Sequence, residues 1–285
     1  MERSEKNKVE SSTLYLVATP IGNLADISER AKKVLSEVDF IAAEDTRNSM
    51  KLCTALGIKN EFVSYFEHNK KSSGEKIIAR LLSGENCALI TDAGMPAISD
   101  PGEDIVRLAS EAGITVTVVP GACAAVSALA LSAISTARFA FEGFLSAQKN
   151  ERRKRLESLK REDRTLIFYE APHKLKATLL DMCDVFGEER KISICREITK
   201  LNEEVIRTTL GKAVEIYSEK EPRGEYVLII EGMTESASEE NPLCALSPSE
   251  HVNHYIGLGF AKMDAIKAAA RDRGMSKSEM YKLVL

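Results

Sequence analysis

Strand-like and helix-like runs alternate along most of this chain, and this alternation restricts the fold more than any other feature. Short apolar runs typical of strands are separated by segments whose apolar residues have helical spacing. The strand-like runs lie at 14–19, 40–43, 87–91, 114–119, 139–144, 165–169, 191–195, 204–208 and 226–230. Strands that alternate with helices usually form parallel sheets covered on both faces. We therefore expect an α/β protein with mainly parallel sheet.

Local signals predict several helix ends. Ser72 and Glu75 have the spacing of a capping box, which predicts a helix that begins there and runs to residue 82. Gly57 is a suitable C-terminal cap for the preceding helix.

The length of 285 residues predicts two domains and a small appendage. Residues 233–246 turn polar and irregular, which is typical of a linker, and the strand-like runs stop there. We predict a disordered N-terminal tail, an N-terminal α/β domain, a C-terminal α/β domain, the linker and a helical extension, with bounds at 1–12, 13–124, 125–232, 233–246 and 247–285.

The C-terminal extension carries its own capping signals. Residues 247–250 combine an N-cap serine, a proline and a reciprocal glutamate. A helix over 261–273 is expected to end at Gly274, and Ser276 with Glu279 predicts the start of another. Two helices joined by a glycine turn resemble a helix-turn-helix, although a docking bundle that binds no nucleic acid explains the pattern equally well.

Residues 112–137 contain no charged side chain, and such a stretch is long enough to span a membrane. However, Pro120 and Gly121 interrupt it, and Ala, Ser, Thr and Gly are frequent in it. We therefore predict a strand at 114–119 that is buried on both faces, a tight turn, and a helix packed on both sides.

The cysteine pattern and the N-terminus favour a cytoplasmic protein with reduced thiols. The six cysteines include no Cys-x-x-Cys pair, so neither a metal site nor a redox site is expected. Residues 1–12 are polar and do not resemble a signal peptide. The glycine signatures of dinucleotide sites and P-loops are also missing, which argues against dehydrogenases and kinases.

Loops rich in glycine and proline follow three of the predicted strands, at 19–23, 91–102 and 119–122. In parallel sheets the carboxyl ends of the strands form the ligand crevice. Glycine allows backbone amides to approach a small ligand closely, so three such loops together predict a binding site.

These loops, together with segments 43–47, 141–145 and 169–173, resemble the tetrapyrrole methylase superfamily and most closely its branch of small-subunit ribosomal RNA methyltransferases. The resemblance covers residues 14–231. It implies a two-domain class III methyltransferase fold that holds S-adenosylmethionine between the domains, without a metal, and usually as a homodimer. It also implies 2′-O-methylation of a cytidine in 16S ribosomal RNA, either as naked RNA or in the small ribosomal subunit.

The same resemblance implies which residues line the cofactor pocket. The helix start after Gly121 would hold the carboxylate, Asp92 would bind the ammonium or ribose hydroxyls, and second-domain residues would pack near the adenine. The full set is Pro20, Asp92, Ala93, Gly94, Met95, Ile98, Ser99, Pro120, Gly121, Ala122, Phe144, Leu145, Ala171, Pro172, Arg223 and Gly224.

A ribose hydroxyl is a poor nucleophile and benefits from a base or an orienting group. Glu44, Asp45 and Arg47 follow the second predicted strand and are candidates for this role. A structural ion pair of Glu44 with Arg47, or an N-cap of the next helix, is the alternative. His173 is a further candidate base, with a place beside a helix start as its alternative.

The basic stretch 149–164 is the best candidate for RNA contact. Its eight basic and four acidic residues give a net charge of +4, and phosphate contacts need such residues. The residues proposed for contact are Lys149, Arg152, Arg153, Lys154 and Arg155. A solvated helix of mixed charge is the alternative.

Two other functions remain open at this point. A methyltransferase acting on a tetrapyrrole precursor would share the cofactor cleft, but it would need neither the basic stretch nor the C-terminal helices. A non-catalytic ribosome-assembly factor would bind RNA without turnover, which the intact glycine loops disfavour.

Overall fold

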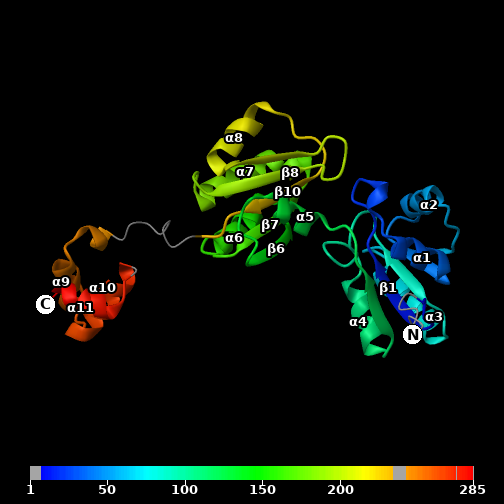
Figure 1. Cartoon of the computed structure of the whole chain (residues 1–285), viewed down its shortest axis with the longest axis horizontal. Coiled ribbons are helices and arrows are strands. Elements are labelled where there is room, and N and C mark those ends of the chain that lie inside the picture. The colour runs from blue at the N-terminus through cyan, green and yellow to red at the C-terminus, as the bar shows by residue number, and fades with distance from the viewer. Residues whose placement is uncertain (1–7, 234–241, 274, 285) are drawn as a thin grey trace, which may run out of the picture. The chain divides into compact units, whose positions relative to one another are not determined.

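The structure is a computed structural model that describes residues 8–233, 242–273 and 275–284. It forms two compact units, one that ends at Gly232 and one that begins at Met233 (Figure 1). The predicted tail 1–12 and linker 233–246 lie largely outside the described residues, and Gly274 lies wholly outside them.

The first unit begins with a sheet of five parallel strands in the order β3-β2-β4-β1-β5. The strands are β1 (Thr13–Val17), β2 (Phe40–Ala43), β3 (Phe62–Ser64), β4 (Cys87–Ile90) and β5 (Thr115–Val119). The sequence analysis missed β3, a strand of three half-buried residues. Its short length gives no clear alternation of apolar and polar residues.

Helices cover both faces of this first sheet, as the apolar strands require. One face packs against α1 (Glu29–Glu37) and α2 (Thr46–Ala55), and the other against α3 (Lys70–Leu82) and α4 (Glu103–Glu111). A short 3-10 turn, η1 (Leu24–Asp26), precedes α1. The neighbouring strands β1 and β4 send their following helices, α1 and α4, to opposite faces, which opens a crevice at their carboxyl ends.

The second sheet of the same unit has the order β6-β7-β10-β8-β9. The strands are β6 (Phe139–Phe144), β7 (Thr165–Glu170), β8 (Lys191–Arg196), β9 (Glu204–Thr209) and β10 (Tyr226–Ile230). Only β6 and β7 pair in parallel, whereas the other three pairings are antiparallel. The expectation of mainly parallel sheet is therefore wrong for this sheet. No helix separates β8 from β9, and so short a connection allows only a hairpin.

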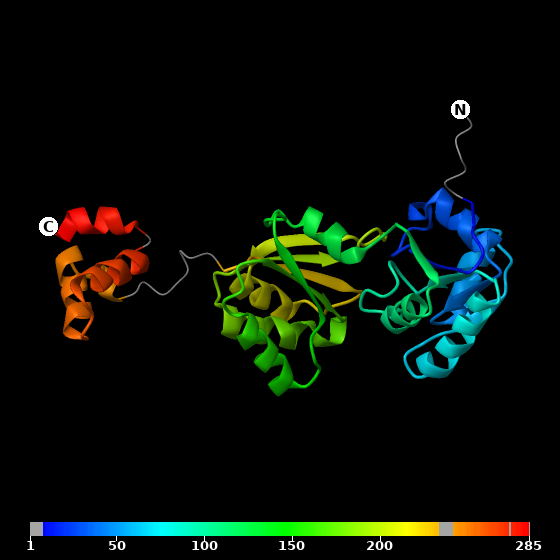
Figure 2. The same ribbon diagram turned by 90° about the horizontal axis from the view of Figure 1, so that it is seen from below.

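The second sheet also has helices on both faces (Figure 2). α5 (Ala124–Leu131) packs on one face, and α6 (Lys149–Leu159), α7 (Pro172–Phe186) and α8 (Leu210–Glu219) pack on the other. α5 directly follows the last strand of the first sheet but packs against the second, so this helix carries the chain between the lobes.

The uncharged stretch 112–137 is less buried than expected. β5 lies at the edge of its sheet, where Thr115 and Val118 are exposed and only Val119 is fully buried. The prediction of a strand buried on both faces is therefore wrong. The residues between β5 and α5 form no hydrogen-bonded turn, and Cys123, the last of them, has extended backbone.

The helix predicted to begin at Ser72 begins at Lys70 instead. The Asn69 side chain accepts a hydrogen bond from the Phe66 amide, which closes a turn just before the helix. Ser72 is therefore already inside the first helical turn, where its hydroxyl donates to the Asn69 carbonyl rather than forming a capping box.

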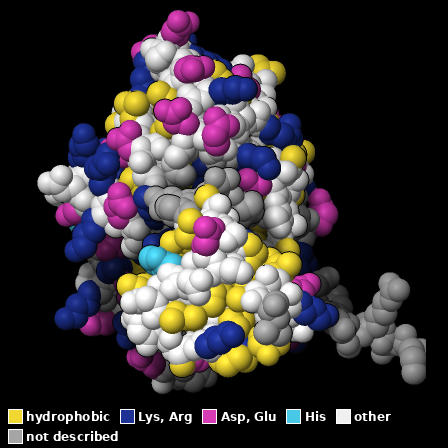
Figure 3. All heavy atoms as spheres, turned by 90° about the vertical axis from the view of Figure 1, so that its left-hand side faces the viewer, with side chains coloured by type: hydrophobic (Ala, Val, Ile, Leu, Met, Phe, Trp, Pro, Cys, Tyr) yellow, Lys and Arg dark blue, Asp and Glu magenta, His cyan; other side chains and the backbone are white. Residues whose placement is uncertain are grey.

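The second unit is helical, with η3 (Pro242–Ala245), α9 (Pro248–Gly257), α10 (Lys262–Asp272) and α11 (Lys277–Val284). The capping box of Ser247 and Glu250 is confirmed, and Ser276 with Glu279 forms the same reciprocal hydrogen bonds at the start of α11. Figure 3 looks onto this unit, where hydrophobic side chains gather on the exposed face. In the part of the chain that the structure describes, no helix is long and apolar enough to cross a membrane.

A buried ion pair joins α6 to α7. The Arg152 side chain is 6% exposed and its Nη2 lies 2.7 Å from Oδ2 of Asp181, which is 5% exposed. The Arg152 guanidinium also donates to the backbone carbonyls of Ser146 and Ala147. The prediction that Arg152 contacts RNA is therefore not supported, because this side chain is enclosed between two helices.

We expect Arg152→Ala to lower the free energy of unfolding by about 3 kcal/mol, because it leaves a buried carboxylate without its main partner. Denaturant unfolding followed by circular dichroism measures this change. Arg138→Ala is the matched control, since the Arg138–Asp163 pair is exposed and should contribute less than about 1 kcal/mol. Equal losses in the two variants would contradict a special role for the buried pair.

Candidate functional site

A cavity of about 420 Å³ opens at the carboxyl ends of the first sheet, within the size range of small-molecule sites. Both lobes of the first unit line it. The first lobe contributes the loops after β1 and β4, and the second contributes the ends of β6, β7 and β8 and the start of β10. Cys123 and Ala124, at the start of α5, complete the wall between the two lobes.

A backbone bridge holds the two first-lobe loops together. The amide of Thr19 donates to the carbonyl of Gly94 at 2.9 Å, and the amide of Gly94 donates back at 3.1 Å. The buried Thr19 hydroxyl donates to the Thr91 carbonyl. Gly94 has a φ of +85°, which an L-residue adopts only with strain, so glycine is needed where the loops meet.

The loop from Asp92 to Gly102 is strained as well as anchored. Ala97 and Ser99 have φ values of +67° and +63°, a region that non-glycine residues rarely adopt. A Cβ atom added to Gly143 of β6 would lie only 3.1 Å from Ser99 Oγ. The two lobes therefore approach closely here. Strained backbone of this kind persists where surrounding structure enforces it, and it is concentrated at functional sites.

Aromatic rings form much of the second-lobe wall. Tyr169 packs edge-on against Phe141 and Phe144, with ring centroids 5.0 and 5.5 Å away. Its hydroxyl accepts a hydrogen bond from the Ala125 amide, and burial raises the pKa of Tyr169 to about 12. One of the α5 amides that the sequence analysis assigned to a ligand carboxylate is therefore already bonded within the protein.

A second, polar part of this wall comes from the hairpin between β8 and β9. Lys200 Nζ lies 2.8 Å from carboxylate oxygens of both Glu197 and Glu225, and all three side chains line the cavity. Glu197 and Thr199 have positive φ values of 51° and 68°, so this hairpin loop is also strained. The Lys200 ammonium pairs with both carboxylates, and the three side chains together keep a net charge of −1.

Asp100 is the acid that remains available. Among the described residues that line the cavity, it is the one carboxylate without a basic side chain within 4.0 Å. Burial raises the pKa of Asp100 to about 6, Glu44 and Asp92 act in the same direction, and the Thr91 hydroxyl opposes them. A cationic group in the cavity would therefore find an unpaired carboxylate and would favour its ionised form.

The catalytic candidates after β2 do not line the cavity. Asp45 is the N-cap of α2, where its carboxylate accepts from the Arg47 amide and pairs with the Arg47 guanidinium at 2.8 Å. These hydrogen bonds lower the pKa of Asp45 to about 2. The capping alternative therefore describes this segment, with Asp45 rather than Glu44 as the cap.

Glu44 and His173 have different positions. Burial and the nearby Asp92 raise the pKa of Glu44. Glu44 is in turn the charged neighbour that most strongly raises the pKa of Asp100. His173 does line the cavity, at the exposed first turn of α7. Of the proposed bases, His173 is therefore the one that a bound substrate could reach directly.

The residues proposed for cofactor contact divide into two groups. Those that line the cavity are Ala93, Gly94, Met95, Ile98, Ser99, Phe144, Ala171 and Pro172. Those outside its lining are Pro20, Asp92, Pro120, Gly121, Ala122, Leu145, Arg223 and Gly224. Leu145 is 5% exposed and packs in the core beneath α6, and Asp92 accepts a hydrogen bond from Asn48 outside the cavity.

Several lining residues were missed from the sequence. Asp100 lies inside a loop that had been singled out, but nothing local showed that it would be the carboxylate without a cation. The residues of β8, its hairpin and β10 had no motif to mark them. They are Cys195, Glu197, Ile198, Lys200, Tyr226 and Val227. Glu225 also lines the cavity and belongs to segment 223–225, which the sequence offered as a weaker candidate for this wall. Glu197 and Lys200, three positions apart in a short hairpin, were a signal, although the second glutamate that pairs with Lys200, Glu225, is distant in sequence.

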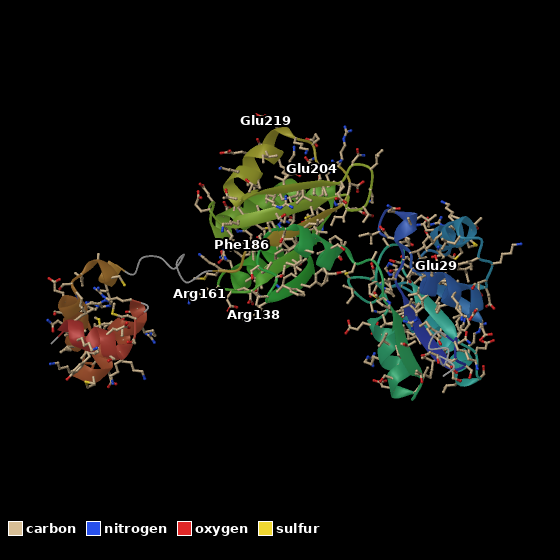
Figure 4. The ribbon with its side chains drawn as sticks, viewed as in Figure 1. Glu29, Arg138, Arg161, Phe186, Glu204 and Glu219 are labelled. Carbon is tan, nitrogen blue, oxygen red and sulfur yellow. The ribbon has the colours of Figure 1, made fainter. Side chains whose placement is uncertain are left out.

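The basic residues of α6 are largely paired. Arg153 binds Asp181 and Asp184, and Arg155 binds Glu142. Within the described chain, no carboxylate lies within 4.0 Å of four exposed cations, Lys149, Lys154, Lys160 and Arg161. Figure 4 shows Arg161 and Arg138 on the same side of the second lobe. The described residues contain no cluster of His, Cys, Asp and Glu suited to a metal ion.

Comparison with known proteins gives consistent matches. The family model of Tetrapyrrole (Corrin/Porphyrin) Methylases matches residues 13–214. The protein named ribosomal RNA small subunit methyltransferase I from Halalkalibacterium halodurans is 49% identical, with 99% of this chain and 98% of that protein aligned. The protein of the same name from Bacillus subtilis is 48% identical, with 98% and 96% aligned. The Escherichia coli O157:H7 protein is 40% identical, with 100% and 99% aligned.

Solved structures show the same fold at low sequence identity. The uroporphyrin-III C-methyltransferase of Thermus thermophilus has a TM-score of 0.54 at 21% identity and covers 77% of this chain and 94% of its own. A cobalt precorrin-4 methyltransferase has a TM-score of 0.55 at 16% identity, with 77% and 95% covered.

We expect the contribution of Asp100 to the stability of the protein to fall as the pH rises from about 4 to about 6. The pKa of Asp100 is raised from 3.8 to about 6 in the folded state, so folding favours its protonated form, and this contribution is lost as Asp100 ionises. Asp100→Asn removes the titration and should be more stable at pH 7 by about 1 kcal/mol, after allowance for solvent screening. Denaturant unfolding at pH 4.5 and 7 measures this. Parallel pH profiles for wild type and variant would refute the assignment.

Proposed function

The chain belongs to the tetrapyrrole methylase family, and we propose that it transfers a methyl group from S-adenosylmethionine to a ribose 2′-hydroxyl of a cytidine in 16S ribosomal RNA. The observation that carries this proposal is the cavity between the lobes, where Asp100 is the one described lining carboxylate with no basic side chain within 4.0 Å. The relatives named ribosomal RNA small subunit methyltransferase I support the choice of substrate.

The cavity fits the chemistry of this methyl donor. S-adenosylmethionine supplies a methyl group on a sulfonium, and it carries an ammonium and a flat apolar adenine. The Asp100 carboxylate would hold the ammonium, and the apolar side chains of Ile21, Ile98 and Phe144 would enclose the adenine and thioether. The anchored loop after β4 would supply backbone groups that need little reorganisation on binding.

The protein's own contribution to rate is mainly alignment. Methyl transfer is an in-line displacement, and holding the hydroxyl opposite the sulfonium removes most of the orientational cost. The two walls of the cavity would hold the donor between them. His173 at the exposed start of α7 is the residue we propose to orient the ribose hydroxyl or accept its proton.

RNA would bind along the basic side of the second lobe. We assign this contact to the unpaired cations Lys149, Lys154, Lys160 and Arg161, and we leave out the buried Arg152. α6 begins shortly after Phe144, which lines the cavity, so a bound strand could reach both. Arg153 and Arg155 remain secondary candidates because their partners are internal carboxylates.

We also propose that the protein acts as a homodimer in the cytoplasm, where ribosomal subunits assemble. Its substrate is either naked 16S ribosomal RNA or the small subunit. The rival functions make different predictions: a tetrapyrrole methyltransferase would modify a porphyrinoid, and a non-catalytic assembly factor would bind RNA without transferring a methyl group.

Transfer of label from S-adenosylmethionine tests the function directly. The protein is offered small ribosomal subunits, naked 16S ribosomal RNA and a porphyrinoid in separate reactions. We expect label in RNA, on a ribose 2′-oxygen, and none in the porphyrinoid. Label in the porphyrinoid alone would favour the tetrapyrrole function, whereas RNA binding without label in any substrate would favour the assembly factor.

In the same assay series, Asp100→Asn should weaken S-adenosylmethionine binding by about tenfold or more, because it removes a charge-assisted hydrogen bond worth about 1.5–3 kcal/mol. Wild-type affinity should rise as the pH rises through about 6, when Asp100 ionises, and the variant should lack this rise. Calorimetry at pH 5 and 7 measures both. Glu197→Gln is the control, since its charge is already paired with Lys200.

For the RNA surface, we expect Lys149→Glu combined with Lys154→Glu to weaken RNA binding several-fold at low salt and to reduce its salt dependence. Filter binding at several salt concentrations measures this. S-adenosylmethionine affinity should stay unchanged. Lys51→Glu combined with Lys59→Glu, two exposed cations of the first lobe, is the control for the same change in net charge. Equal losses in the two proteins would exclude a specific role for α6.

A further inference from the structure

We infer that the open edge of β5 is a contact between two copies of this chain, in which β5 of each copy pairs antiparallel with the other about Thr117. The inference rests on the proposed homodimer and assigns its interface. The starting observation is that 29% of all residues are charged, yet none of residues 112–137 is. Burial does not explain the lack of charge in this stretch, because Thr115, Val118 and Val126 are exposed.

The backbone of β5 has one free side. Within the described chain, β5 pairs only with β1, at the end of the sheet order. The Val119 carbonyl accepts a hydrogen bond from the Ala18 amide, which places the peptide groups of Val119 on the side of β1. Because successive residues of a strand alternate, the amides and carbonyls of Val116 and Val118 point away from β1, toward the open edge.

Among the described residues, nothing gives this edge the usual protection against pairing. Edge strands in native proteins are blunted by charged residues, proline, bulges or a covering segment. β5 consists of Thr and Val alone, has a regular register with β1, and exposes Val118 to 45%. Such an edge is a template for another strand, so a partner that covers it is expected.

The strand is complementary to itself. A two-fold axis at Thr117 would place Val116 opposite Val118 of the other copy, and both pairs would exchange main-chain hydrogen bonds, four in total. The cross-strand neighbours would be Val with Val and Thr with Thr, which are favourable pairs. A two-fold interface uses the same patch twice, so the absence of charge avoids like charges facing each other. RNA or a charged partner would require charges that this edge lacks.

Pairing of this short strand alone buries less area than a stable dimer needs, about 1,200 Å² in total. The uncharged stretch continues beyond the strand, and exposed residues such as Pro120, Val126 and Ala130 would extend the contact. Cys123 and Ala124, which line the cavity, lie within the same stretch. The proposed contact would therefore be adjacent along the chain to the cavity wall.

Disulfide trapping tests the register. In the proposed pair the two Thr117 residues face each other with Cα atoms about 4.5 Å apart, which suits a disulfide. The two Thr115 residues would be about 14 Å apart, too far for a disulfide. Thr117→Cys should therefore form a covalent dimer under mild oxidation, and Thr115→Cys should not. The unmodified protein controls for native cysteines, and peptide mass spectrometry identifies the linked residues.

Sedimentation tests the contact without relying on a new disulfide. Val118→Lys places a charge at the edge and should weaken the dimer at least tenfold, whereas Leu82→Lys, on an exposed position of α3, should not. Circular dichroism confirms that both variants are folded. A monomeric wild type, a dimer unaffected by Val118→Lys, or linkage through residue 115 instead of 117 would each overturn the inference. Methyl transfer is measured separately, so a dimer without transfer would contradict only the proposed function.

Discussion

The antiparallel bridge between Thr19 and Gly94 is the constraint on which the site depends. It joins the loops after β1 and β4 at the point where their following helices depart to opposite faces of the sheet. Two backbone hydrogen bonds and the Thr19 hydroxyl fix the loops against each other. With its start held in this way, the remainder of the loop after β4 can carry the strained backbone of Ala97 and Ser99 at the cavity.

The two lobes contribute different chemistry to the cavity. The first lobe supplies small residues, backbone groups and the carboxylate of Asp100, which its acidic neighbours and burial keep difficult to ionise. The second lobe supplies aromatic rings and two glutamates that both pair with Lys200. A cationic ligand would thus meet one carboxylate without a cation in a mostly apolar cavity. This arrangement would fix the orientation of the ligand.

The ion pairs also distinguish basic side chains that stabilise the fold from basic side chains that are free to contact RNA. Arg152 stabilises the contact of α6 with α7 from a buried position, while Lys149 and Lys154 on the same helix remain exposed. The uncharged edge of β5 has the opposite character and suits a contact in which like surfaces meet. The same unit therefore offers a basic surface for RNA and a neutral edge for assembly.

The sequence by itself determined the α/β class, most strand positions, the caps of the C-terminal helices and the loops at the strand ends, because periodicity and turn residues act over a few neighbouring positions. Only the tertiary structure decided the antiparallel pairings of the second sheet, the exposure of β5, the burial of Arg152 and the identity of Asp100 as the unpaired acid. Each of these depends on which distant segment lies alongside. The partner of a carboxylate or of a strand edge is set by the fold, so a local sequence pattern does not predict it.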